Sequence, residues 1–351
     1  MVKQQRKPLR WIECLPNQPE VCTMNNATLK NISQLLDLSI STVSRALQNH
    51  PDISEKTKVR VRELAVTMDY EPNANAINLR TSNTRLFGLI VPSISNFFYH
   101  SFISSVEEEC RKNNYALMIL QSAEDPAVEA ASLKLCRQNR ITGLFTCISS
   151  HTNQLEPYTK FKELKIPVVF FDKVPDTTDC HKVCVADAAS AAMAAEAIIN
   201  KKKKKVLAIF GDERLLITRK RLAAFKETMG TKAPSIEILI DFADSAGHAQ
   251  SLSAHYLKQK PDTIFCMSDE ILTGAMKAIQ KEQLVWPEEI AVIAISNGFV
   301  PTLYHPEITY VETSGHILGK LAFASMMACV RGGTSFEEFT TEAVLVEGGS
   351  L

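Results

Sequence analysis

The sequence DLSISTVSRALQNHPDISEKTK, which runs from Asp37 to Lys58, decides how the N-terminal part of the chain folds. Its apolar residues recur at helical spacing. Val43, Ala46 and Leu47 fall on one side of a helix for which Ser39 is the predicted N-cap. The opposite side carries hydroxyl groups and an arginine, a composition that suits either solvent or a polar ligand.

Helices are also predicted on both sides of this segment. In the first, capped by Thr28, the apolar residues that share one face are Leu29, Ile32, Leu35 and Leu36. In the third, which starts after Ser54, the expected inward residues are Val61, Leu64, Ala65 and Met68, and the expected outward ones are Lys56, Lys58, Arg60 and Arg62. Three short helices with a tight turn between the first two predict a helix-turn-helix unit.

The polar face of the middle helix suits recognition of DNA in the major groove. The residues expected to point outward are Ile40, Ser41, Ser44, Arg45 and Gln48. Arg45 can donate two hydrogen bonds to guanine, Ser41 can donate or accept, and Ile40 can cover a thymine methyl group. A solvated amphipathic helix has the same spacing, so spacing alone leaves that alternative open.

From residue 86 onward, apolar runs alternate with amphipathic helical stretches. The runs are LFGLIVP, ALMIL, ITGLFTCIS, PVVFFD, VCVAD, VLAIFGD, IEILID, TIFCMSD, IAVIAIS and ITYVE. Such runs predict buried parallel strands in βαβ units. Because ten strands are too many for one small sheet, we predict an α/β fold of two doubly wound subdomains with a cleft between them.

Charge and cysteine usage narrow the class of protein. Residues 24–85 carry eight Lys/Arg and six Asp/Glu, whereas residues 86–351 carry 27 and 31, which favours a nucleic-acid-facing N-terminal part. Nine scattered cysteines without a C-x-x-C pair indicate a reducing cytoplasm. No apolar run predicts a membrane span or a secretory signal. The residues Cys180, His181 and Cys184 are the minor alternative for a metal site; we predict neither a metal nor a cofactor.

These motifs resemble those of the lactose-repressor (LacI/GalR) family. The DNA-binding segment is matched by LSISTVSRAL, ISEKTKVRV and YEPN, and the similarity extends from about Ala27 to Val346 through LFGLIVPSISNFF, RITGLF, TRKRLAAF, MSDEILTGAMKAI and WPEEIAVIAIS. The resemblance implies a homodimer, with a tetramer as the alternative. It also implies two DNA-binding heads on a pseudo-palindromic operator and a sensor core like that of periplasmic binding proteins.

The resemblance implies roles for individual residues in the DNA-binding part. Ile40, Ser41 and Arg45 match the family's base readers, and Thr42 and Asn49 fall where contacts to the DNA backbone are expected. Leu79 matches a leucine that enters the minor groove at the operator centre. The other DNA-binding candidates are Thr28, Ser39, Ser44, Asn73, Ala76 and Arg80.

The resemblance also implies an effector site between the two subdomains. Arg221 matches an arginine that grips the effector, and Asp269 matches an aspartate that bonds its hydroxyl groups. Phe98 and Tyr99 fall at an aromatic pocket edge, and Asp172 ends an apolar run, where ligands of open α/β sheets collect. The remaining candidates are Thr218 and Ser296, and Ser296 stands where the family usually has Asp. This set suits a sugar, a polyol or a phosphorylated sugar.

The predicted organisation follows the motifs along the chain. Residues 1–25 are expected to be a disordered extension, 26–71 the helix-turn-helix domain, 72–84 a hinge helix with a linker, and 85–351 the effector-binding and dimerisation core. Within the core, the expected N-subdomain is about 85–184 with 313–342, and the C-subdomain about 185–312 with 343–351.

The predicted function is a cytoplasmic, allosteric DNA-binding transcription regulator, a repressor controlled by a sugar or sugar derivative. The alternative keeps the DNA-binding head but has a drifted pocket that answers to a protein or to no small molecule. An enzyme is disfavoured, because the sequence lacks G-x-x-x-x-G-K-[ST], G-x-G-x-x-G and G-x-S-x-G. A sugar-binding transport protein is disfavoured by the DNA-binding head.

Overall fold

The computed structural model describes residues 28–71, 84–152, 155–333 and 336–351. The chain divides into two compact units, residues 1–80 and 81–351. The predicted N-terminal extension and the predicted hinge residues lie outside the described ranges; the latter are Asn73, Ala76, Leu79 and Arg80.

The described residues of the first unit, 28–71, form three short helices, as predicted. They are α1 (Leu29–Leu36), α2 (Ile40–Leu47) and α3 (Glu55–Thr67). The predicted N-caps Thr28, Ser39 and Ser54 are confirmed, because each side chain accepts a hydrogen bond from the backbone N–H three residues ahead. Asp37 ends α1 in the left-handed region, with φ of 54°. These caps fix the tight turn between α1 and α2.

The core of this unit is small and apolar. Its fully buried members are Ile32, Val43, Ala46 and Val61. Two predictions about the helix faces are wrong. Leu35 is 65% exposed, because the buried stripe of α1 is centred on its neighbours and Leu35 lies beyond its edge. Lys58 is only 5% exposed, because it lies one turn before Val61 on the buried stripe, and its Nζ reaches Glu55 Oε1 at 2.7 Å.

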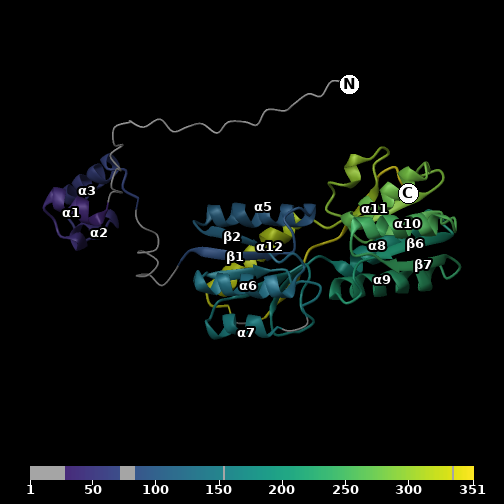
Figure 1. Cartoon of the computed structure of the whole chain (residues 1–351), viewed down its shortest axis with the longest axis horizontal. Coiled ribbons are helices and arrows are strands. Elements are labelled where there is room, and N and C mark those ends of the chain that lie inside the picture. The colour runs from purple at the N-terminus through teal and green to yellow at the C-terminus, as the bar shows by residue number, and fades with distance from the viewer. Residues whose placement is uncertain (1–27, 72–83, 153–154, 334–335) are drawn as a thin grey trace, which may run out of the picture. The chain divides into compact units, whose positions relative to one another are not determined.

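The described residues of the second unit form two six-stranded sheets (Figure 1). The first has the order β11-β5-β4-β3-β1-β2 and is parallel throughout. Its strands are β1 (Leu86–Val91), β2 (Ala116–Gln121), β3 (Gly143–Thr146), β4 (Val168–Phe171), β5 (His181–Cys184) and β11 (Glu338–Thr340). The central register pairs Leu89 with Ile119 on β2 and with Phe145 on β3.

The second sheet has the order β12-β10-β9-β8-β6-β7, and only β12 is antiparallel to its neighbour. Its strands are β6 (Lys205–Phe210), β7 (Glu237–Phe242), β8 (Thr263–Cys266), β9 (Ala291–Ser296), β10 (Thr309–Glu312) and β12 (Val344–Val346). The ten predicted strands and the α/β class are therefore confirmed. The two further strands β11 and β12 are three residues long and partly exposed, so they lack the continuous apolar run of a buried strand.

Helices cover both sheets. Those on the first are α5 (Phe97–Lys112), α6 (Pro126–Gln138), α7 (Glu156–Glu163) and α12 (Gly315–Val330). Those on the second are α8 (Asp187–Asn200), α9 (Leu216–Lys232), α10 (Ala246–Leu257) and α11 (Asp269–Lys281). On β1, Leu89 joins the core cluster of α5 and α12, whereas Ile90 joins that of α6 and α7. This alternation places the two helix layers on opposite faces, as Figure 1 shows for α5 and α6.

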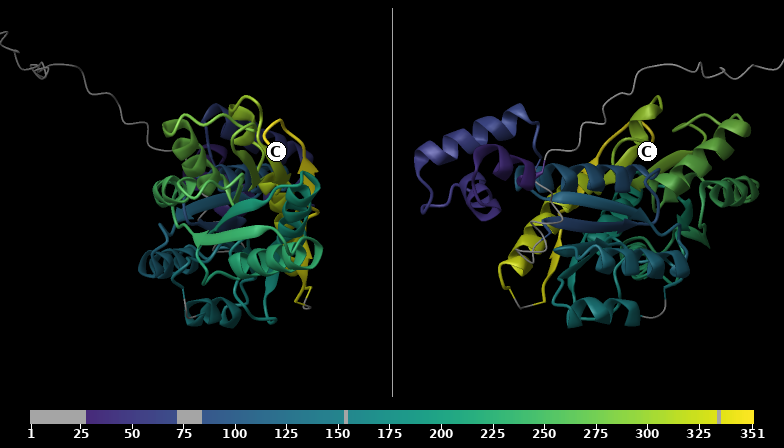
Figure 2. Two further views of the ribbon diagram at one scale, coloured as in Figure 1. Left: turned by 90° about the vertical axis from the view of Figure 1, so that its right-hand side faces the viewer. Right: turned by 60° about the vertical axis from the view of Figure 1, so that its left-hand side comes forward.

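The chain passes between the two sheets after β5, after β10 and after β11. The second passage brings α12 back to lie beside α5 (Figures 1 and 2). Gly319 allows the close approach, since a Cβ atom there would lie 2.7 Å from Ser105 Cβ. At Gly315, a Cβ atom would lie 2.5 Å from the carbonyl oxygen of Phe98. The backbone at the start of α12 therefore lies close against the first turn of α5.

The seven described cysteines are free thiols, and Cys184 is buried within β5. In the described residues, no three His, Cys, Asp or Glu side chains gather in a way that suits a metal ion. No helix among these residues is long and apolar enough to cross a membrane.

Candidate functional site

The first candidate site is the outward face of α2. The DNA-binding candidates within the described residues are Thr28, Ser39, Ile40, Ser41, Thr42, Ser44, Arg45 and Asn49. Ile40 is 49% exposed although it is a large apolar residue, and Ser41 and Arg45 are exposed beside it. Val43 and Ala46 on the other side are fully buried. The face therefore presents an apolar side chain, a hydroxyl and a guanidinium from one helix.

Hydroxyl groups cluster at the N-terminus of α2. Ser39 Oγ lies 2.8 Å from both Ser41 Oγ and Thr42 Oγ1, and it accepts a hydrogen bond from the Thr42 backbone N–H at 3.0 Å. The positive end of the helix dipole and several hydroxyl donors suit a phosphate group.

Asn49 lies just after α2 in the left-handed region, with φ of 57°. Its Oδ1 accepts a hydrogen bond from Arg62 Nη2 of α3 at 3.0 Å. The pairing holds the side-chain amide of Asn49 in one orientation and leaves its NH₂ group to donate elsewhere. Arg62 is a supporting residue that spacing along α2 alone does not indicate.

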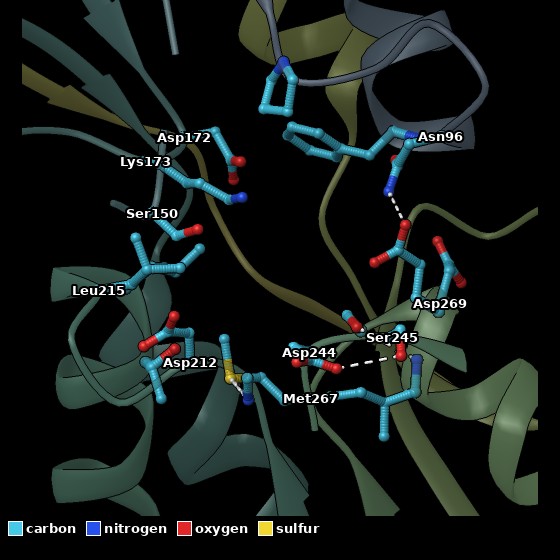
Figure 3. Close-up of a pocket in the computed structure, with 18 of the residues that line it drawn as sticks. Asn96, Ser150, Asp172, Lys173, Asp212, Leu215, Asp244, Ser245, Met267 and Asp269 are labelled. Carbon is cyan, nitrogen blue, oxygen red and sulfur yellow. Dashed lines mark hydrogen bonds between the residues drawn. The ribbon is translucent and has the colours of Figure 1, made fainter. Parts of the chain in front are cut away.

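The second candidate site is a cavity of about 560 Å³ in the second unit. Its walls are formed by segments that follow β1, β2, β3 and β4 of the first sheet and β6, β7, β8, β9 and β10 of the second. All seven predicted effector residues line it: Phe98, Tyr99, Asp172, Thr218, Arg221, Asp269 and Ser296. Figure 3 shows Asp172 and Asp269 on opposite sides of this cavity. A cavity at the carboxyl ends of parallel strands is where open α/β sheets bind ligands.

Tyr99 and Asp172 form one wall. The Tyr99 hydroxyl donates to Asp172 Oδ2 at 2.7 Å and lies 3.3 Å from Cys147 Sγ. Burial, together with the neighbouring Asp172, raises the pKa of Tyr99 well above its ordinary value, so the hydroxyl stays protonated and donates. Asp172 has φ of 56° just after β4. Its Oδ1 has no hydrogen-bond partner within the described part of the chain and can accept a donor from a ligand.

The guanidinium group of Arg221, on α9, is held by hydrogen bonds to two groups of the protein. Its Nε donates to Asp187 Oδ1 at 2.9 Å, and its Nη1 donates to the Met267 carbonyl oxygen at 2.8 Å. Burial raises the pKa of Asp187 to about 6, and the Arg221 guanidinium offsets part of this shift. Asp187 was not among the predicted site residues. The sequence does contain a feature that indicates it. The apolar run VCVAD ends in Asp187, just as the run PVVFFD ends in Asp172.

Asp269 is the first residue of α11 and forms the opposite wall. Its Oδ1 accepts a hydrogen bond from the Ser296 hydroxyl, and its Oδ2 accepts one from the Asn297 backbone N–H at 3.1 Å. Ser296 Oγ in turn accepts from the Gly298 N–H at 2.9 Å. Burial raises the pKa of Asp269, whereas these hydrogen bonds lower it. Ser296 thus acts as a neutral donor that orients Asp269, at a position where the resembled family usually has a second carboxylate.

Thr218 has an unsatisfied hydroxyl. The residue lies in the first turn of α9, and its side chain is fully buried at the cavity wall. Its Oγ1 has no hydrogen-bond partner among the described residues. A buried hydroxyl without a partner is costly, so a ligand that reaches this atom gains a hydrogen bond that the protein leaves open.

Two further ion pairs line the cavity that the motifs did not indicate. Lys173 pairs with Glu124, which also accepts hydrogen bonds from the backbone N–H and the hydroxyl of Ser150 at 2.8 and 3.0 Å. Burial raises the pKa of Glu124, but Lys173 and Ser150 outweigh it, and the net shift is downward. Arg214 donates to both carboxylate oxygens of Asp212, with Nε at 2.9 and 3.1 Å.

Two known families match the chain. Residues 28–73 match the bacterial regulatory proteins of the lacI family, and residues 84–345 match the periplasmic binding proteins and sugar-binding domain of the LacI family. Among curated relatives, the ribose operon repressor of Haemophilus influenzae is 24% identical over 311 residues, which are 87% of this chain and 92% of the relative. The HTH-type transcriptional repressor PurR of Aliivibrio salmonicida is also 24% identical, over 309 residues, with the same shares covered.

Solved structures share the fold. A lac repressor dimer bound to operator and the anti-inducer ONPF superposes with a TM-score of 0.83 at 18% identity, covering 93% of this chain and 99% of that one. A periplasmic binding protein/LacI transcriptional regulator from Alkaliphilus metalliredigens, complexed with D-xylulofuranose, has a TM-score of 0.65 at 23% identity and covers 76% of this chain and 98% of its own.

Proposed function

The chain belongs to the LacI family of bacterial regulatory proteins, and from this premise we propose that it is a sequence-specific DNA-binding transcription regulator. In this proposal it acts as a repressor, and a sugar or sugar derivative in the cavity controls its affinity for the operator. The relatives named above are transcription regulators, which agrees with a protein that is not an enzyme.

The exposed face of α2 carries the DNA-binding part of the proposal. Ile40, Ser41 and Arg45 are assigned to base edges in the major groove, since together they offer an apolar contact, a hydroxyl and a bidentate donor. Thr42, at the hydroxyl-rich start of the helix, and Asn49 are assigned to the DNA backbone. The hinge candidates, including Leu79 in the minor groove, remain predictions from the family resemblance.

The single observation that best supports the effector is Thr218. The residue lines the cavity, and its buried Oγ1 has no hydrogen-bond partner among the described residues. Arg221 and Asp269 line the same cavity from α9 and α11. A sugar hydroxyl can donate to a carboxylate and accept from a hydroxyl, so a polyol satisfies both walls. The alternative of a pocket that answers to a protein or to nothing is not favoured, because it leaves this arrangement without a ligand.

The proposed partners follow from the relatives. A related lac repressor was solved as a dimer on operator DNA, and we assign the same arrangement to this chain: a homodimer on a pseudo-palindromic site. A regulator of bacterial genes works in the cytoplasm, where the DNA lies.

Selection of bound sites from random duplex DNA tests the proposal, with and without a panel of sugars and sugar derivatives. The expected result is a pseudo-palindromic consensus whose occupancy changes when one compound is added. Failure to enrich any sequence would refute sequence-specific binding. A consensus whose occupancy responds to no compound, together with no thermal shift by any of them, would instead favour the drifted-pocket alternative.

A further inference from the structure

The cavity is lined by more acidic than basic side chains. The lining carboxylates are Glu124, Asp172, Asp212, Asp244, Asp269 and Glu270, whereas the lining cations are Lys173, Arg214 and Arg221. The acidic side chains therefore outnumber the lysines and arginines two to one. A ligand enters a space that already carries an excess of negative charge.

Each lining cation is already engaged by a carboxylate. Lys173 pairs with Glu124, and Arg214 pairs with Asp212. Arg221 pairs with Asp187 behind the wall at 2.9 Å. An anionic group on a ligand would have to displace one of these carboxylates or share its cation.

Several lining carboxylates, in contrast, have no lysine or arginine in ion-pair contact within the described residues. Asp172 accepts from the Tyr99 hydroxyl, and Asp269 accepts from Ser296 and a backbone N–H. Glu270 accepts from Asn96 Nδ2 at 3.3 Å. Burial raises the pKa of Asp269, as expected where a carboxylate loses water without gaining a counter-ion. These three carboxylates can therefore bind hydrogen-bond donors or a positively charged group of a ligand.

The first turn of α9 lines the cavity, and the backbone N–H groups at a helix N-terminus can bind an anion. Leu215 precedes this helix and provides no side-chain cap. However, the Asp212 carboxylate already lies before this turn, where it accepts from the Arg214 backbone N–H at 3.0 Å and from its guanidinium. Thr218 in the same turn offers a neutral hydroxyl. The site is therefore suited to a hydroxyl oxygen rather than to a phosphate.

We infer that the cleft takes a polyhydroxy compound without negative charge, either neutral or bearing an amine, and that it rejects the phosphorylated or carboxylated form of the same compound. This inference rests on the proposed function and narrows its ligand class. Hydroxyl or ammonium donors of the ligand meet Asp172 on one wall and Asp269 on the other, and a ligand oxygen accepts from Thr218.

The electrostatic potential inside the cleft can be measured without knowing which compound is the effector. The ε-methyl group of Met267, which lines the cavity, is labelled with ¹³C in the full chain, and its relaxation is measured with a cationic and with an anionic nitroxide of the same size. The cationic nitroxide is expected to relax this methyl at least about twofold more strongly, because it accumulates at negative potential. Equal relaxation, or stronger relaxation by the anionic nitroxide, overturns the inference.

Variants assign the effect to the cleft. Asp172→Asn/Asp269→Asn should bring the relaxation ratio close to one. Glu163→Gln/Glu227→Gln is the matched control, because it also removes two carboxylates and both residues, on α7 and α9, are exposed outside the cavity; it should leave the ratio unchanged. A ratio that falls equally in both variants would show that the overall charge of the protein, rather than the cleft, attracts the cation.

Matched sugars give a second measurement. D-glucose, D-glucosamine and D-glucose 6-phosphate are compared by calorimetry, as are D-ribose and D-ribose 5-phosphate. A phosphate should bind at least tenfold more weakly than its parent, or about 1.4 kcal/mol. A phosphate that binds as tightly as its parent overturns the inference; if no sugar binds, the relaxation ratio decides. Operator binding is measured separately, so loss of DNA binding refutes the proposed function and leaves the charge result standing.

Discussion

Nε of Arg221 lies 2.9 Å from Oδ1 of Asp187, and the two side chains are only 6% and 5% exposed. The pair is therefore a buried ion pair, in which the loss of water opposes the attraction between the charges. It also means that Arg221, the residue that the sequence motif singles out for the effector, reaches the cavity with its guanidinium already held by the protein. A ligand in the cavity would meet an arginine that is already fixed and paired with a carboxylate.

The pH dependence of folding tests this pair. The pKa of Asp187 is raised from 3.8 to about 6, so the folded chain binds this proton more tightly than the unfolded chain. The contribution of the group to stability is then complete below about pH 4 and is lost as the pH rises through 6. Asp187→Asn lacks this titration. Its stability relative to the parent should rise by about 2–3 kcal/mol between pH 4 and pH 7 in urea unfolding.

A fall in the stability of Asp187→Asn relative to the parent as the pH rises would contradict this prediction. If the parent gains stability over Asp187→Asn as the pH rises, the attraction of Arg221 outweighs burial and the pKa of Asp187 is lowered.

Arg45 is expected to read a base rather than a phosphate. Arg45→Ala should cost about 1–3 kcal/mol on the selected operator and relax the preference at one position in each half-site. Arg45→Lys is the matched control, since it keeps the charge and loses the bidentate fork. Both variants should lose the base preference in a binding assay at one fixed salt concentration. Equal losses on operator and random duplex would assign Arg45 to the phosphate backbone instead.

Thr218→Val replaces the unpartnered hydroxyl with a methyl group of nearly the same size. The variant loses no hydrogen bond within the described protein, so its stability should be unchanged or higher by up to about 1 kcal/mol. Its affinity for the effector found by the panel should fall about tenfold, because the ligand loses a donor. Operator affinity without effector should stay as in the parent. An unchanged effector affinity would remove Thr218 from the binding site.

Gly319 tests the close approach of α12 to α5. Gly319→Ala should destabilise the protein by about 2 kcal/mol, because the new methyl would lie 2.7 Å from Ser105 Cβ and 2.9 Å from the Phe102 carbonyl oxygen. Gly230 of α9 is the matched control, since nothing lies within 4 Å of an added Cβ there. Gly230→Ala should stabilise the helix by about 0.5 kcal/mol. Similar effects of the two substitutions on urea unfolding would argue against tight packing at Gly319.

Local rules predicted the type and order of the helices and strands well, because the apolar pattern of most elements agrees with their burial. Ser39 is predicted as a cap and accepts from the Thr42 N–H, and the ten apolar runs form ten strands. The runs of β2 and β7 are predicted to be buried but lie at the sheet edges, where no residue of either strand is buried. One error concerns a side chain that has one part in the core and another part in an ion pair. Lys58 was predicted outward from its charge, but its stem fills the buried stripe while its ammonium group reaches Glu55. Residue type alone does not indicate such a side chain.

The sequence indicated residues of the cavity but not the links among them. Asp172, Thr218, Arg221 and Asp269 were selected from motifs and strand ends, and the structure brings them to one cavity. Their hydrogen-bond partners depend on how segments far apart in the chain meet, as with Arg221 and Asp187. One rule would have found more of them: an acid directly after an apolar strand lies at the edge where the cavity forms.

The three passages of the chain between the sheets have a consequence for protein engineering. A fragment that stops after β5 would lack both β11 and α12, and with α12 it would lose Leu318, Ala322 and Met326, which are fully buried in the core of the first sheet. Neither half of the second unit is therefore encoded by one uninterrupted stretch of the gene. An expression plasmid for either half alone has to join distant segments through an artificial linker, whereas simple truncation exposes an unfinished core to aggregation.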